Sequence, residues 1–174
     1  MKKIMILFVA VMCMAATTQI QAQEKGDMAA GVQFAYGTGD SFSNIGLGVK
    51  FQWNVIDRLR LEPSFNYFFE KDMIGMWDFS ANVHYQIPLG GMVDIYPLAG
   101  LGIMGVSVDV PSFDLGGYGT VGGGSASDSE FGLNLGVGAD FKLSDIWGIS
   151  VEAKYKIGGE WSRLIIAAGV TYKF

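Results

Sequence analysis

Hydrophobic side chains recur at every second position over eight segments of this chain, and this periodicity limits the possible folds more than any other feature. Successive side chains of a strand point to opposite faces, so a period of two predicts β-structure. The segment at 147–157 shows it most cleanly, with its apolar positions at Trp147, Ile149, Val151, Ala153, Tyr155 and Ile157. The predicted strands cover 27–37, 44–55, 59–70, 76–88, 93–108, 129–143, 147–157 and 161–174.

The apolar faces of these strands carry more bulk than a small barrel can enclose. An eight-stranded barrel has an interior just wide enough to be filled by side chains, and the apolar faces hold rings such as Phe34, Trp53 and Phe65. The other faces are mostly Gly, Ser, Asn and charged residues. We therefore expect the bulky faces to point outward into lipid, with aromatic girdles near the strand ends.

This reasoning predicts an all-β fold, an eight-stranded antiparallel transmembrane up-and-down β-barrel. A soluble periplasmic sandwich is the alternative, because its strands also alternate with one apolar face buried.

The first 22 residues have the composition of a secretory signal peptide. Lys2 and Lys3 precede an apolar run at 4–16, and Ala22 stands before the expected cleavage site. The run has 13 residues, fewer than the roughly 20 that a membrane-spanning helix requires. We expect a signal peptide at 1–22 and a mature barrel domain at 23–174; a lipoprotein cleaved before Cys13 is the alternative.

The mature chain is acidic and lacks cysteine. It carries 10 Lys and Arg against 17 Asp and Glu, a net charge of −7, because the signal peptide contains two lysines and no acid. Such a charge disfavours nucleic-acid binding. Because the only cysteine, Cys13, lies in the signal peptide, neither disulfides nor thiolate chemistry is expected.

The connections predict how the barrel is oriented. With both termini in the periplasm, the first, third and fifth connections, at 38–43, 71–75 and 109–128, are outer loops, and those at 56–58, 89–92 and 144–146 are short inner turns. The glycine-rich segment 109–128 is predicted to be a flexible surface loop. It is the candidate contact for an extracellular ligand.

The lumen faces of the predicted strands carry titratable side chains of both signs. The candidate network, structural or pore-lining, comprises Lys50, Arg60, Glu62, Asp78, His84, Asp140, Glu152, Lys154 and Arg163. With Lys142, Lys156, Lys173 and Asp94, seven cations face five anions. Burying an isolated ion costs several kcal/mol, so these charges are expected to pair. A polar plug is favoured over a selectivity lining.

Two motifs in the sequence could indicate an enzyme. His84 is the only histidine. Counting residues through the hairpin between the third and fourth predicted strands places Glu62 opposite it. We expect this pair to form a structural hydrogen bond rather than to act as a catalytic acid and base. Residues 100–105 fit G-x-G-x-x-G, but no helix follows, as a dinucleotide site requires. Gly100 and Gly102 are instead expected to reduce bulk in the lumen or at a bend.

Together these features resemble the small outer-membrane barrels of the OmpA, OmpX and opacity type, the porin-family barrels of Gram-negative envelopes. The resemblance covers the whole mature chain and is most specific in the last strand, whose one face reads Leu164, Ile166, Ala168, Val170, Tyr172 and Phe174. It implies that Tyr172 and Phe174 are an assembly signal read by the barrel-assembly machinery. It also implies periplasmic chaperones, outer-membrane lipids and lipopolysaccharide as partners.

The expected function is that of a non-enzymatic monomer in the outer membrane, reached by signal-directed export. Its barrel would be an anchor, and its outer loops would serve envelope stabilisation, adhesion or partner binding. A narrow porin-like channel for ions or very small solutes is the alternative. A lipid-modifying enzyme is less favoured, because His84 is expected to point away from lipid. No catalytic residue, metal or cofactor is predicted.

Overall fold

The computed structural model describes residues 25–39, 43–71, 74–114, 120–159 and 162–174. The predicted signal peptide at 1–22 lies outside these ranges. Within them, no helix combines the length and the apolar character needed to cross a membrane.

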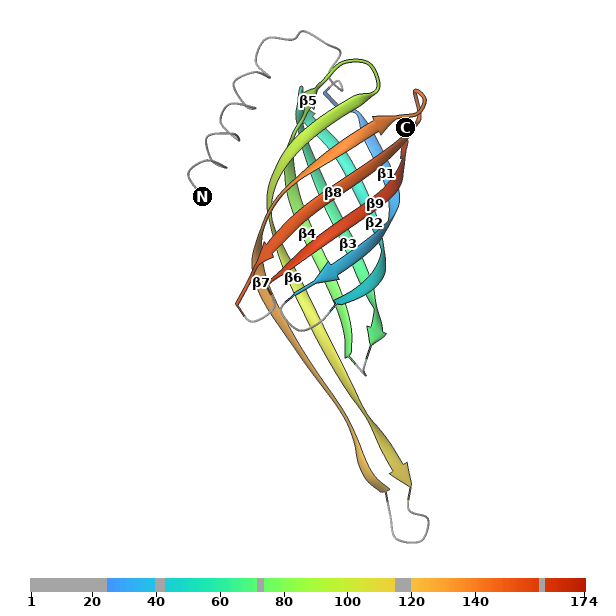
Figure 1. Ribbon diagram of the computed structural model, residues 1–174, viewed down its shortest axis with the longest axis vertical. Coiled ribbons are helices and arrows are strands. Elements are labelled where there is room, and N and C mark those ends of the chain that lie inside the picture. The colour runs from blue at the N-terminus through green and yellow to red at the C-terminus, as the bar shows by residue number, and fades with distance from the viewer. Residues whose placement is uncertain (1–24, 40–42, 72–73, 115–119, 160–161) are drawn as a thin grey trace.

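Antiparallel strands close into a barrel in which each strand pairs with its neighbours around the circle (Figure 1). They are β1 (Met28–Thr38), β2 (Ser43–Ile56), β3 (Leu59–Lys71), β4 (Ile74–Tyr85), β5 (Ile87–Pro88), β6 (Val93–Asp114), β7 (Thr120–Lys142), β8 (Trp147–Ile157) and β9 (Arg163–Lys173). The circle closes where β1 pairs with β9, Ala29 facing Lys173. β4 and β5 form one strand interrupted at Gln86, so the predicted eight-stranded barrel is confirmed.

The two ends of the barrel differ. One end, here called the turn end, carries the connections at 57–58, 89–92 and 143–146, the start of β1 and the C-terminus (Figure 1). The opposite end carries the long β6–β7 hairpin and is called the hairpin end. This places the predicted inner turns, the start of β1 and the C-terminus together at one end.

The β6–β7 hairpin continues well beyond the barrel wall (Figure 1). These strands pair as far as Asp114 and Thr120, whereas β4 pairs with β6 only to Val108 and β8 pairs with β7 only to Leu133. The prediction of a loop over 109–128 is therefore wrong for most of its length. Glycine weakens strand propensity, but the register already set in the barrel offers each added residue a backbone partner. Residues 115–119 lie outside the described residues.

The β3–β4 hairpin is tighter than the sequence suggested. β3 runs to Lys71 and β4 begins at Ile74, so the expected long outer connection at 71–75 is wrong, and the register shifts between Phe68 and Lys71. The prediction that Glu62 faces His84 is wrong for the same reason. Arg60 faces His84, and Glu62 faces Asn82.

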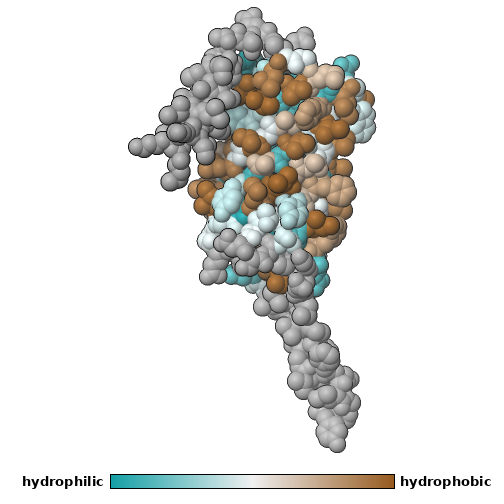
Figure 2. All heavy atoms as spheres, in the orientation of Figure 1, coloured by the Kyte–Doolittle hydropathy of each residue, from teal (hydrophilic) through white to brown (hydrophobic). Residues whose placement is uncertain are grey.

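The outer surface is apolar, as the strand pattern predicted. Phe34 is 72% exposed and Val32 63%, and Figure 2 shows hydrophobic residues over the visible face of the barrel. Aromatic contacts occur near both ends. At the turn end Trp147 packs against Tyr172 with ring centroids 5.1 Å apart, and nearer the hairpin end Phe65 stacks on Trp77 at 6.3 Å. The bulky faces thus point outward, with rings near both ends of the barrel, as expected for aromatic girdles.

Candidate functional site in the barrel interior

All of the nine predicted lumen residues are buried inside the barrel. Their members are Lys50, Arg60, Glu62, Asp78, His84, Asp140, Glu152, Lys154 and Arg163. Glycines on neighbouring strands make room for such large side chains. A Cβ at Gly138 would overlap the Tyr96 ring, and one at Gly102 would crowd Lys156 Nζ. The glycines that mimic a dinucleotide motif thus include a position of close packing in the lumen.

The buried charges balance. Lys142 and Lys173 were predicted to face the lumen, but their side chains are 35% and 44% exposed at the turn-end rim, where they pair with Asp94 and Asp27. Among the described residues, the buried charged side chains are therefore five cations and five anions. They are Lys50, Arg60, Lys154, Lys156 and Arg163 with Glu62, Asp78, Asp94, Asp140 and Glu152.

Arg60 organises the half of the lumen near the turn end. Its Nη1 donates to Asp140 Oδ2 at 2.6 Å, and its Nη2 lies 2.9 Å from His84 Nδ1. The guanidinium also lies 4.8 Å from the centroid of the Tyr96 ring, which stacks on His84 at 4.4 Å. Sequence reasoning missed Tyr96, because an aromatic residue was not expected on the lumen face.

Glu62, His84 and Glu152 meet at the centre of this half, from β3, β4 and β8. His84 Nε2 lies 3.9 Å from Glu62 Oε1 and 3.9 Å from Glu152 Oε2. Glu62 and His84 therefore lie close together, as expected, but they are diagonal neighbours on β3 and β4 and do not face each other. Two lysines flank the carboxylates, Lys50 at 3.7 Å from Glu62 and Lys154 at 3.6 Å from Glu152.

Asp78 forms a second centre deeper in the lumen. Its carboxylate pairs with Lys156 Nζ and lies 3.9 Å from Lys154 Nζ. Ser80 Oγ donates to it at 3.0 Å and Asn66 Nδ2 at 3.4 Å. Asp78 is fully buried, so these donors and cations replace the water that its charge would otherwise require.

The lumen changes character near the hairpin end, where an apolar plug fills it. The plug comprises Ala35, Phe68, Met76, Met104, Ile165 and Ala167. Arg163 lies against it, with its guanidinium 4.9 Å from the Phe68 ring centroid and its Nη2 donating to Asn44 at 2.6 Å. The sequence favoured a polar plug throughout most of the lumen. Apolar residues on the lumen face, such as Leu98 and Met104 in the fifth predicted strand, were the signal of an apolar section.

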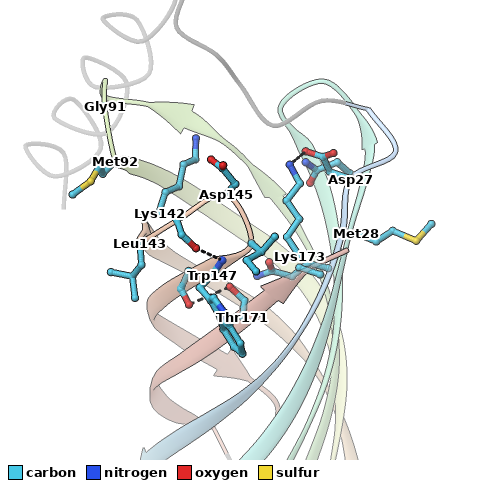
Figure 3. Close-up of a pocket in the computed structure, with 16 residues that line it drawn as sticks. Asp27, Met28, Gly91, Met92, Lys142, Leu143, Asp145, Trp147, Thr171 and Lys173 are labelled. Carbon is cyan, nitrogen blue, oxygen red and sulfur yellow. Dashed lines mark hydrogen bonds and ion pairs between the residues drawn. The ribbon is translucent and has the colours of Figure 1, made fainter.

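A cavity of about 550 Å³ opens at the turn end (Figure 3). Its lining includes the rim side chains Lys142 and Lys173 and, deeper, Gln52 and Asn54. Gln52 Nε2 donates to Glu62 Oε2 at 2.8 Å, so the cavity borders the ionic network. The lumen is thus hollow at the turn end, polar in the middle and apolar near the hairpin end.

The predicted assembly residues Tyr172 and Phe174 lie on the outer surface at the turn end. Tyr172 is 42% exposed and Phe174 65%. Phe174 N donates to Met28 O at 3.1 Å, which ties the last residue to the first strand of the closed sheet.

The chain matches one known protein family over nearly its whole length. The sequence matches the outer membrane protein β-barrel domain over residues 5–174. No curated protein matches it.

Several solved structures have a similar fold. The attachment invasion locus protein Ail of Yersinia pestis is 18% identical, with a TM-score of 0.60 over 86% of this chain and 99% of that chain. The N-terminal barrel domain of Pseudomonas aeruginosa OprF is 14% identical, with a TM-score of 0.62 over 86% and 100%. Neisserial surface protein A is 17% identical, with a TM-score of 0.63 over 85% and 96%. At such identities the likeness concerns the fold.

Proposed function

This chain belongs to the outer membrane protein β-barrel family, and from that premise we propose that it is a non-enzymatic outer-membrane anchor whose β6–β7 hairpin binds a partner outside the cell. One observation carries the proposal: an apolar plug closes the lumen of the barrel, while a separate two-stranded ribbon extends past the barrel wall. Export by the signal peptide at 1–22 would deliver it, and Tyr172 and Phe174 would serve assembly.

The filled lumen supports an anchor rather than a pore. Phe68, Met104 and Ile165 are at most 1% exposed inside the hairpin end, and an apolar constriction opposes the passage of ions because it excludes water. Below this plug, the buried charges pair across the lumen instead of lining an open path.

The narrow channel is the second candidate, favoured by the cavity at the turn end and the polar middle of the lumen. Recording in planar lipid bilayers separates the two. We expect the purified barrel to insert without stepwise conductance, beside a porin reconstituted in the same way as the positive control. Reproducible conductance steps from the barrel would replace the anchor with the channel.

The buried position of His84 supports a non-enzymatic role. The ring is 0% exposed and contacts Tyr96 and Arg60 inside the barrel, where a lipid substrate cannot reach it. A lipid-modifying reaction would require an accessible acid or base at the outer surface.

The composition of the hairpin indicates the chemistry of its partner. Residues 109–130 contain Asp109, Asp114, Asp128 and Glu130 and no Lys or Arg. Ail has been solved in complex with the heparin analogue sucrose octasulfate, but a polyanion of this kind would be repelled by the acidic hairpin of the present chain. A basic surface is complementary to it.

Excision of the hairpin tests this assignment. Val108 faces Ala126, so replacing residues 109–125 with Asn-Gly closes the ribbon with a two-residue turn in register. We expect heat-modifiable migration on gels and membrane insertion to persist, because the barrel ladder is untouched. Binding of poly-L-lysine to proteoliposomes should fall, because Asp109 and Asp114 are lost with the replaced residues, and heparin should bind neither form. Unchanged poly-L-lysine binding would show that the hairpin is only a connector.

Cysteine labelling tests the proposed orientation. The mature chain has no cysteine, so Ser125→Cys and Ser144→Cys each introduce a single thiol, on the hairpin and on the turn at 143–146. On intact cells a membrane-impermeant maleimide should label residue 125 and leave residue 144 unlabelled until the outer membrane is permeabilised. The reverse pattern would invert the barrel.

A further inference from the structure

Three buried polar groups converge in the lumen without direct hydrogen bonds between them. Glu62, His84 and Glu152 each place one ligand-type atom within 4.8 Å of the other two. The two distances from His84 Nε2, 3.9 Å each, are too long for a hydrogen bond. Neither His84 Nε2 nor Glu152 Oε2 has a hydrogen-bond partner among the described residues, although both side chains are at least nine-tenths buried. Buried polar atoms without a protein partner are commonly satisfied by a bound water or ion.

Arg60, which contacts the Nδ1 side of the His84 ring, determines whether Nε2 is a hydrogen-bond donor or an acceptor. Arg60 places Nη2 at 2.9 Å and Nε at 3.3 Å from His84 Nδ1. A guanidinium has donors only, so Nδ1 must accept. A neutral imidazole then carries its proton on Nε2, and that N–H is directed towards the two carboxylates.

We propose that a single ordered water molecule occupies this triangle and bridges Glu62, His84 and Glu152. A water oxygen above the centre of three atoms spaced in this way lies at hydrogen-bond distance from each of them. The hydrogen bonds that a water can form also match the site, because the water accepts one from His84 Nε2–H and donates one to each carboxylate. Buried waters typically make about three such bonds.

A divalent cation fits the same residue types but not this arrangement. Histidine and two glutamates are zinc ligands elsewhere, yet a metal needs the lone pair of Nε2, and Arg60 already requires the lone pair of Nδ1. Both cannot be met by a neutral ring. The carboxylates are also already compensated by Lys50 and Lys154, so a dipositive ion would add uncompensated charge to a buried site. Water adds none.

The bridging water would join β8 to the paired strands β3 and β4, which lie on the other side of the lumen and do not pair with it. Glu62 and His84 lie on the adjacent strands β3 and β4, whereas Glu152 lies on β8. The water would therefore tie the two sides of the barrel together. This role is independent of the partner of the hairpin and of conduction.

The single histidine makes the test direct. Barrel refolded without a histidine tag and labelled with ¹⁵N in the imidazole ring gives one pair of nitrogen signals. We expect a protonated Nε2, an accepting Nδ1 and a cross-peak between Nε2–H and a long-lived water, all unchanged by excess zinc chloride. A protonated Nδ1, no water cross-peak, or a saturable zinc-induced shift of Nε2 would overturn the proposal, and the last would identify a metal site instead.

A matched pair of variants adds a second readout. Glu152→Leu removes one acceptor of the triangle, and the water cross-peak should disappear while Asp145→Asn, at the exposed turn, leaves it unchanged. Heat-modifiable migration identifies folded protein in each case. If the leucine variant folds and keeps the cross-peak, the water is held elsewhere and the proposal fails. If it does not fold, the wild-type spectra still decide.

Discussion

Replacing Asp78 by leucine is expected to lower the free energy of unfolding by about 3–5 kcal/mol, because removing one partner of a buried ion pair leaves an uncompensated charge. Asp78 is fully buried and pairs with Lys156, with Lys154 at 3.9 Å. Both ammonium groups would face a lumen that has lost a carboxylate. Urea unfolding of the barrel in lipid vesicles, followed by tryptophan fluorescence, measures the loss.

Two further variants separate this cause from general disruption. Adding Lys156→Met to Asp78→Leu should recover part of the loss, because the pair is then replaced rather than broken. Lys173→Ala breaks the ion pair with Asp27 at the rim. Because Lys173 is 44% exposed, this variant should lower the free energy of unfolding by only about 0–1 kcal/mol. Equal losses for Asp78→Leu and Lys173→Ala would show that the lumen is hydrated enough to screen its charges.

Val151→Arg is expected to destabilise the barrel by about 2–4 kcal/mol, the cost of a cation on the lipid face near the bilayer midplane. Val151 lies in the middle of β8, is 42% exposed and points outward between Ala139 and Ala168 of the neighbouring strands. Unfolding in lipid vesicles gives the free energy. The penalty should shrink in detergent, where the surroundings adapt around a charge more easily than a bilayer does.

Ser150→Thr is the control for Val151→Arg, because Ser150 is the preceding residue and faces the lumen. It keeps the hydroxyl that accepts from Lys50 Nζ at 2.6 Å, so a mild effect is expected. If Val151→Arg lowers the free energy of unfolding in vesicles no more than Ser150→Thr does, the outer face of β8 does not contact lipid.

Strand identity could be predicted because it depends on local chemistry. The alternation of Trp147, Ile149 and Val151 with smaller or charged residues requires a period of two wherever the strand lies, and β8 has the predicted bounds. The same alternation assigned Lys50, Arg60 and Glu62 to the lumen. Bulk then decided which face turns outward, because an eight-stranded barrel cannot enclose so many rings.

Register could not be predicted to the residue. One bulge and a short connection between β3 and β4 moved the partner of His84 from Glu62 to Arg60. The glycine-rich segment at 109–128 was expected to be a loop because propensity describes a residue without its partner. In the fold, β6 and β7 enter it already paired and continue.

The sequence by itself thus determined the strands of the barrel wall, their inward and outward faces, the closure into a barrel and most of the charges in the lumen. Only the tertiary structure decided which of these charges meet. Arg60 reaches Asp140, 80 residues away, and His84 approaches Glu152 on β8. It also showed that apolar residues close the hairpin end. The physical reason is that contacts across a barrel depend on the stagger and tilt of all its strands together, whereas the face of a side chain depends only on its own strand.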